Sequence, residues 1–299
     1  MIEPTGYWTF FCNPKKWHID KFLSSSTVID NFSISKHHKD YFNKGQLGVV
    51  RVGYDKRTKA ELQNRPRLKR GVYAIVEILD VPKLMKSTKK EYGEDEKEDE
   101  EDRLRVSIRC LKNLLHNPVL LEQLNLSAEV SDKHLVKGQQ GSTMPLNPSA
   151  FENLLSKVGG LDTLEFDFQE GNQTSLKLLE EKYADAVPLV KQRVSKYIER
   201  GSIAQEFKRK TNFKCQICDS LGLNPYSFKK PDGEYYIETH HVIPVSTLQA
   251  GLLSSYNLIT VCANHHRQLH YGKVKLIENT AEIFVFEIDD NIVQIPKGQ

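Results

Sequence analysis

The sequence has 299 residues, enough for two ordinary domains, and its 39% hydrophobic and 27% charged residues are typical of a globular protein. No apolar run approaches the roughly 18 residues needed to cross a bilayer. The first residues lack a basic segment followed by an apolar one, so we expect no signal peptide there. Composition therefore predicts no membrane partner and an intracellular location.

The net charge of +3 is small, but the charges are segregated. Residues 191–230 hold ten Lys and Arg against three Asp and Glu, a balance that suits contact with a polyanion. Nine of the twelve residues of 91–102 are acidic, which predicts a solvated loop. Both blocks are also typical of an ordinary solvated surface, so they do not by themselves indicate nucleic-acid binding.

Up to about residue 168, short alternating apolar runs predict β-strands. These runs, rich in β-branched and aromatic residues, are 6–12, 46–54, 71–79 and 104–111. A helix is expected over residues 148–158, because Asn147 can cap its start and two glycines follow its end. The mixture predicts a small α+β or β-barrel domain over residues 1–168.

From Thr174 to about Arg200 the apolar residues recur at helical spacing, and Pro188 is expected to interrupt the pattern. We interpret residues 169–201 as a helical connector. It leads to a second domain, 202–299, which carries the residues with recognisable chemistry.

Cysteine spacing in the second domain predicts a metal site. The five cysteines of the chain are Cys12, Cys110, Cys215, Cys218 and Cys262. An odd number argues against a disulfide framework and for a reducing compartment. Cys215-x-x-Cys218 is matched by Cys262-x-x-His265, and two pairs at this spacing can close four ligands around Zn²⁺. Four protein ligands leave no open position, so this zinc is expected to be structural.

Four further histidines lie among these cysteines: the adjacent pair His240 and His241, and the pair His266 and His270. Residues i and i+4 of a helix share a face, so His266 and His270 can bind one ion. Adjacent residues of a strand face opposite sides, yet at the end of a strand both can serve one site in different roles. The alternative, ordinary surface or core histidines, is disfavoured by their crowding among three cysteines.

With THHVIP, YNLITVC and HHRQLH in this order, residues 208–272 resemble the HNH nuclease family, whose fold is two β-strands and an α-helix around one catalytic metal. The resemblance implies His240 and His266 as ligands of a divalent ion: Mg²⁺, Mn²⁺ or another transition metal. It implies His241 as the general base and Asn257 as the brace of the loop that holds this base. His270 is implied as a third ligand or as a phosphate contact.

One departure from the family is His265, where many relatives have cysteine; this leaves the zinc ligand set in doubt. The implied chemistry is phosphodiester hydrolysis, in which a divalent ion stabilises the charge that develops on the phosphate and the leaving oxygen. A neutral imidazole with a pKa near 6.5 can take a proton from water at physiological pH.

The N-terminal segments WTFFCNPKKWHIDKF, GVYAIVEILDVPKL and QGSTMPLNPSAFENLL resemble the EVE family of PUA-like β-barrels, over most of residues 6–165. The resemblance implies a pocket for one flipped, modified base, with flat apolar walls and polar groups at the Watson–Crick edge. The expected walls are Trp17, Phe32 and Tyr41, the expected acceptor for a cytosine amine is Asp30, and further hydrogen bonds are expected from Asn13 and Ser33. The alternative for each aromatic residue is core packing.

An EVE-like reader joined to an HNH-like nuclease resembles modification-dependent (type IV-like) restriction endonucleases, which cut foreign DNA carrying 5-methylcytosine or 5-hydroxymethylcytosine. The resemblance implies double-stranded DNA with modified cytosine as the partner and a location in the bacterial cytoplasm. One such site cuts one strand at a time, so double-strand breaks would need two sites, as in a homodimer. Two alternatives stay open: a homing or repair nuclease whose N-terminal domain binds RNA or unmodified DNA, and a zinc-stabilised binding module without catalysis.

Overall fold

The computed structural model describes residues 4–87, 92, 101–124, 132–138, 141–168, 176–243, 253 and 255–297. The chain divides into two compact units. Unit 1 comprises residues 1–167 and 185–190, and unit 2 comprises residues 168–184 and 191–299. Most of the acidic run 91–102 lies outside the described residues. Over the ranges that are described, no helix is both long and apolar enough to cross a membrane.

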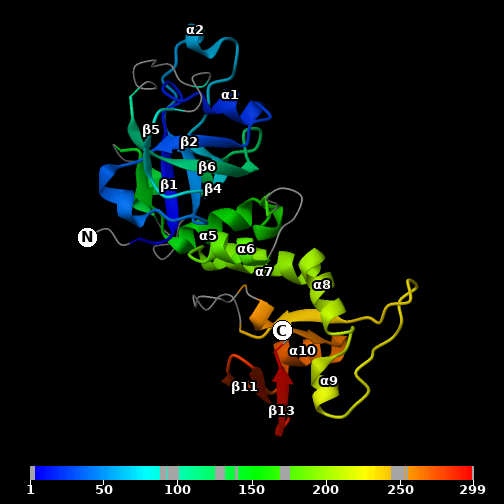
Figure 1. The fold of residues 1–299 in the computed structure, drawn as a ribbon. Coiled ribbons are helices and arrows are strands. Elements are labelled where there is room, and N and C mark those ends of the chain that lie inside the picture. The colour runs from blue at the N-terminus through cyan, green and yellow to red at the C-terminus, as the bar shows by residue number, and fades with distance from the viewer. Residues whose placement is uncertain are drawn as a thin grey trace. The chain divides into compact units, whose positions relative to one another are not determined.

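The strands described in unit 1 form one mixed sheet, of which Figure 1 labels β1, β2, β4, β5 and β6. Its order is β2-β6-β4-β3-β1-β8, with β5 beside β6 and β7 beside β4. These strands are β1 (Tyr7–Cys12), β2 (Ile29–Ser33), β3 (Leu47–Val52), β4 (Gly71–Ile78), β5 (Lys83–Met85), β6 (Arg103–Asn113), β7 (Val119–Leu120) and β8 (Thr143–Pro145). β1 runs parallel to β3, and β4 runs antiparallel to both of its long neighbours.

The two edges of this sheet are joined by side chains. Just beyond β2, the backbone N–H of Ser35 donates to Oγ1 of Thr143 in β8, and Nδ1 of His38 lies 3.1 Å from the same oxygen. Register shifts in the pairings β3–β4 and β4–β6 mark bulges, which bend a sheet. The sheet therefore curves far enough for its edges to meet, and its central strands β3 and β4 are buried along their whole length.

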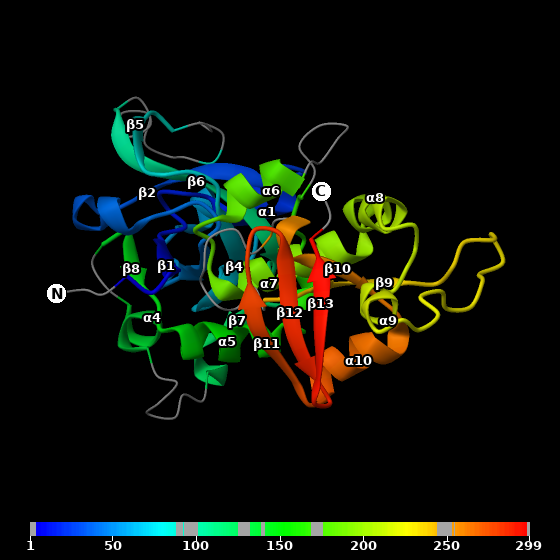
Figure 2. The ribbon, with the colours of Figure 1, turned by 60° about the horizontal axis from the view of Figure 1, so that its bottom comes forward.

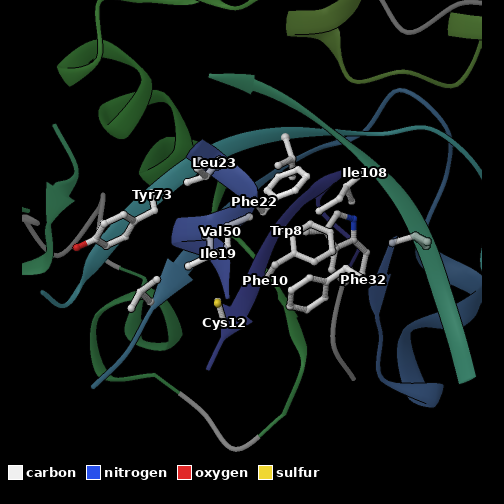
Figure 3. Packing of buried hydrophobic residues seen from close by; sticks show 14 of the residues in the cluster. Trp8, Phe10, Cys12, Ile19, Phe22, Leu23, Phe32, Val50, Tyr73 and Ile108 are labelled. Atoms are coloured by element: carbon white, nitrogen blue, oxygen red, sulfur yellow. The ribbon is translucent and has the colours of Figure 1, made fainter. Parts of the chain in front are cut away.

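Aromatic and aliphatic residues pack together in the core of unit 1 (Figure 3). Trp8 stacks on Phe42 with 3.7 Å between ring centroids, and its indole N–H donates to Gln46. Phe10 meets the ring of Phe32 edge-on. The helical segments of this unit are α1 (Ile19–Ser24), η1 (Lys36–Tyr41), α2 (Lys59–Leu62), η3 (Leu121–Gln123), α4 (Lys133–Lys137), α5 (Pro148–Lys157) and η4 (Leu161–Thr163).

Unit 2 is built on a two-stranded ladder followed directly by a helix. β9 (Glu238–His241) pairs antiparallel with β10 (Leu258–Val261), and α10 (Ala263–Tyr271) begins two residues later. An antiparallel meander, visible in Figure 2, adds apolar side chains to the same core; it consists of β11 (Val274–Asn279), β12 (Ile283–Ile288) and β13 (Asn291–Pro296). The other helical segments are α6 (Leu176–Tyr183), α7 (Pro188–Arg200), α8 (Ser202–Lys210), α9 (Gln216–Ser220) and η5 (Ser255–Asn257). The first three residues of α7 belong to unit 1.

The predicted mixed α+β architecture is confirmed. Each of the four predicted strands corresponds to one of β1, β3, β4 and β6. The predicted helix over 148–158 is α5, and the side chain of Asn147 caps it by accepting from the N–H of Ser149. Pro188 does interrupt the helical pattern, and it is the first residue of α7, a position where its missing N–H costs no hydrogen bond. The sequence patterns do not predict β2, β5, β7, β8 or β11–β13.

Candidate functional site

Three cysteines and one histidine of unit 2 converge on a common point. Sγ of Cys215 and Sγ of Cys218 each lie 3.3 Å from Nδ1 of His265, and Sγ of Cys262 lies 3.5 Å from the same nitrogen. Cys215 and Cys218 flank the first turn of α9, while Cys262 and His265 flank the first turn of α10. The cluster therefore joins the starts of two helices.

This donor set fits a tetrahedral metal ion. Metal–sulfur and metal–nitrogen bonds of ordinary zinc length would place sulfur and nitrogen about 3.5 Å apart at a tetrahedral angle. Burial raises the pKa of the Cys215 thiol, and burial together with the Cys215 thiol raises that of Cys218. Burial lowers the pKa of His265, which keeps its imidazole neutral. The thiols thus need a cation before they can ionise together, and the imidazole is ready to act as a ligand.

A second cluster consists of His240 from β9 and of His266 and His270 from one face of α10. Nε2 of His266 lies 3.3 Å from Nε2 of His270, and the ring centroids of His240 lie 5.2 and 4.8 Å from those of His266 and His270. Burial, followed by the neighbouring imidazoles, lowers the pKa of His240 to about 3. The same two causes lower the pKa of His270. Uncharged imidazoles with facing nitrogens are suited to hold a divalent ion.

Glu238 orients one of these imidazoles. It precedes His240 by two residues in β9, so both side chains lie on the same face of the strand. One carboxylate oxygen pairs with Nδ1 of His266, and the other accepts a hydrogen bond from the hydroxyl of Tyr236. With Nδ1 turned to the carboxylate, Nε2 of His266 faces the other histidines, an arrangement typical of metal-binding histidines. Sequence reasoning missed Glu238, although the Glu-x-His alternation on a strand could have revealed it.

His241 faces the opposite side of β9 and contacts α7. Its Nδ1 lies 2.7 Å from Oε1 of Glu199 and 3.0 Å from Oγ of Ser195. Its Nε2 is buried and has no hydrogen-bond partner among the residues that the structure describes. Burial alone would raise the pKa of Glu199, but the hydrogen bond and charge of His241 lower it below its ordinary value. Glu199 and Ser195 were missed because nothing in the local sequence links them to His241.

Two further contacts describe the surroundings of His241. The charge of Glu199, which contacts His241, also acts to raise the pKa of His240 and of His270. The side chain of Asn257 fixes the backbone two residues after His241. Its Oδ1 accepts from the N–H of Ile243 at 2.9 Å, and its Nδ2 donates to the Ile243 carbonyl at 3.0 Å.

The residues expected to form a base pocket are held together only in part. Trp17 donates its indole N–H to Oδ2 of Asp30 at 3.1 Å, and its ring meets Phe32 edge-on at 5.5 Å. Asp30 is only 4% exposed, and Phe32 belongs to the hydrophobic core, as the alternative of core packing anticipates.

The other three expected pocket residues lie in different settings. Ser33 ends β2 and is partly buried, Tyr41 packs partly buried against the core, and Asn13 is exposed with its Oδ1 accepting from the N–H of Lys15. Their placement in a base pocket stays a prediction.

Comparison with known proteins gives matches of different extent. The EVE domain family matches residues 6–157. A stretch of 57 residues, 19% of this chain, is 44% identical to the type IV methyl-directed restriction enzyme EcoKMcrA of Escherichia coli (strain K12). The match spans only 20% of that enzyme's length.

Among solved structures, a protein from Agrobacterium tumefaciens aligns with a TM-score of 0.35 and 16% identity, over 52% of this chain and 93% of its own. The human THYN1 protein in complex with 5-methylcytosine containing DNA aligns with a TM-score of 0.33 and 14% identity, over 51% of this chain and 97% of its own.

Proposed function

The chain belongs to the EVE domain family, and from that premise we propose that it is a DNA endonuclease directed by a modified cytosine. On this proposal, residues 1–168 form the domain that recognises the modified base, and residues 202–299 form an HNH nuclease domain. Residues 169–201 form a helical connector between the two domains. The observation that carries the proposal is the convergence of the imidazoles of His240, His266 and His270 beside a second histidine of β9, His241, whose buried Nε2 has no partner within the described part of the chain.

The chemical roles follow from the donor atoms. His240, His266 and His270 would hold a divalent ion, which when bound stabilises negative charge on the phosphate and on the leaving 3′ oxygen. Nitrogen ligands without a carboxylate favour a transition metal such as Zn²⁺, Ni²⁺ or Co²⁺ over Mg²⁺. His241 would take a proton from the attacking water through Nε2, since its Nδ1 faces Glu199.

The Cys215, Cys218, Cys262 and His265 cluster would hold a structural zinc ion. Its place at the start of α10 gives it a second role, because His265 and His266 are neighbours on that helix and point into different clusters. Fixing His265 therefore also fixes the direction in which His266 leaves the helix. We propose that zinc binding sets the geometry of the catalytic cluster as well as stabilising the fold.

The proposal that the chain recognises a modified base is supported by its membership of the EVE domain family and by its similarity to EcoKMcrA. EcoKMcrA is methyl-directed, and the shared stretch of 57 residues favours a related purpose for this chain. The substrate would be double-stranded DNA carrying 5-methylcytosine or 5-hydroxymethylcytosine, with restriction of foreign DNA as the biological role. Cutting both strands would require two nuclease sites, as a homodimer would supply.

The test is digestion of paired duplexes that differ only in their cytosines: unmodified, 5-methylated or 5-hydroxymethylated. Each is incubated with the full chain and Ni²⁺, Co²⁺, Mn²⁺ or Mg²⁺ in turn, and the products are separated on a denaturing gel. We expect cleavage of at least one modified duplex and none of the unmodified duplex. Equal cleavage of all three would instead indicate a nuclease of another purpose. Binding without cleavage under every metal would indicate a binding module.

A further inference from the structure

We infer that Glu199 is a positioning residue for the nuclease reaction, one that fixes His241 so that Nε2 accepts the proton of the attacking water. The inference rests on the proposed function, in which His241 is the general base. It concerns a side chain on α7, outside the segment 208–272 whose motifs resemble the HNH family.

The first step is the tautomer of His241. A neutral imidazole carries one hydrogen, on either Nδ1 or Nε2, and the partner of each nitrogen decides which. An ionised carboxylate can only accept, so Glu199, with Oε1 at 2.7 Å, favours the hydrogen on Nδ1. The lone pair is then left on Nε2. Since Nε2 is buried without a partner among the described residues, no protein donor found there competes for that lone pair.

The second step is the choice between the two groups that face Nδ1. Oγ of Ser195 lies 3.0 Å from Nδ1 and can either donate or accept, so alone it would fix neither tautomer. The Glu199 oxygen is closer and charged, which makes its hydrogen bond the stronger one. The Ser195 hydroxyl is also within 3.5 Å of the Glu199 carboxylate, to which it can donate. Ser195 therefore supports Glu199 rather than replacing it.

The third step is the rigidity of the arrangement. Ser195 and Glu199 are four residues apart on α7 and share one face of the helix. The hydroxyl of Thr239 in β9 donates to the backbone carbonyl of Glu199 at 2.9 Å, which fixes the end of α7 beside the strand that carries His241. Orientation of the ring thus depends on a side-chain contact and a backbone contact between the same two elements.

The experiment is a double-mutant cycle in the full chain, with cleavage of a modified duplex measured under single-turnover conditions. His241→Ala should lower the cleavage rate by ~10²–10⁴-fold, as expected for loss of a general base. Glu199→Ala should lower it by ~10–100-fold, the usual effect of removing a group that orients a functional histidine. Glu199→Gln should fall between Glu199→Ala and wild type, because an amide oxygen can still accept but carries no charge.

Two comparisons separate positioning from a structural role. In the His241→Ala background, Glu199→Ala should change the remaining rate by less than about twofold, because its effect passes through His241. Ser195→Ala is the matched control on the same face of α7 and should cost only a few-fold (~3-fold) in rate. DNA affinity, metal content and melting temperature of Glu199→Ala and of Ser195→Ala should match those of wild type.

A second readout does not depend on cleavage. In chain labelled with ¹⁵N-histidine, the His241 signal, identified by its loss in His241→Ala, should show hydrogen on Nδ1, and Glu199→Ala should shift it toward the Nε2–H form. Three outcomes would each overturn the inference. The first is a wild-type cleavage rate in Glu199→Ala, and the second is an equal loss of rate from Glu199→Ala in the wild-type and His241→Ala backgrounds. The third is an Nε2–H signal for His241 in the wild-type chain. Failure of wild type to cut any duplex would overturn the proposed function, and the nitrogen spectrum would still decide whether Glu199 sets the tautomer.

Discussion

In unit 2 the predicted ligand residues lie with their donor atoms facing one another. In unit 1, by contrast, the predicted pocket residues Trp17 and Asp30 form a hydrogen bond with each other. The sulfurs and nitrogen of the Cys215 cluster crowd within 4.8 Å, and so do the nitrogens of the His240 cluster. Each of these groups of donor atoms could hold a cation between them. In unit 1 the indole N–H already satisfies the carboxylate oxygen.

This difference teaches what each region needs in order to work. On the proposed function, an ion would complete each cluster of unit 2, so removing one ligand should damage folding or metal binding strongly. The proposed pocket of unit 1 is already satisfied internally, so a base would have to compete with Trp17 for Asp30. Changes there should therefore alter recognition by a smaller factor and leave the fold intact.

The largest effect is expected from Cys215→Ser. Structural zinc in small domains binds with about 10–16 kcal/mol, comparable with the whole stability of a domain, about 5–15 kcal/mol. Loss of one buried thiolate should therefore unfold unit 2 and release about one zinc ion per chain. Zinc content by mass spectrometry and the thermal unfolding profile check this outcome.

Cys110→Ser is the control for this prediction, because Cys110 is a free thiol of unit 1 outside both clusters. It should keep the full metal content. If Cys215→Ser stays folded and retains its zinc, the structural-zinc assignment is wrong, and the comparison between an ion-dependent unit and a self-contained one fails with it.

A smaller effect is expected from Glu238→Gln. Glu238 pairs with Nδ1 of His266, and the loss of such an outer partner typically weakens metal affinity ~10–100-fold. Competition between the chain and a chromophoric chelator for Ni²⁺ or Co²⁺ measures the change. Glu206→Gln on α8, where the carboxylate pairs only loosely with Lys210, is the matched control and should leave affinity unchanged. Equal affinity in both variants would show that Glu238 does not support the cluster.

How far the sequence predicts this site depends on the distance along the chain between partners. Cys215 with Cys218 and His266 with His270 are close neighbours, so helical and turn periodicity bring them together. Glu199 lies 42 residues before His241 and meets it only because α7 packs beside β9, a tertiary contact that no local pattern encodes. In the same way, the bond from Trp17 to Asp30 depends on how the chain between them turns.

The smallest effect, and the sharpest test of unit 1, is expected from two substitutions of Trp17. Trp17→Ala removes both the ring and the donor to Asp30, so affinity for a modified duplex should fall about tenfold or more, since stacking on an aromatic ring contributes ~1–3 kcal/mol per base. Trp17→Phe keeps a ring but removes the N–H that occupies Oδ2 of Asp30. If a cytosine amine uses that oxygen, Trp17→Phe should lose less than tenfold, because the base no longer competes with the indole for it.

Titration of paired modified and unmodified duplexes measures both Trp17 variants, with metal content and melting temperature followed in parallel. Affinity for the unmodified duplex should stay at the wild-type level and fall with salt in all three proteins, because phosphate contacts do not involve this pocket. If both variants prefer the modified duplex as strongly as wild type does, Trp17 is not part of the base pocket. The family assignment would not be affected. Equal losses in Trp17→Ala and Trp17→Phe would instead show that the bond to Asp30 itself builds the pocket.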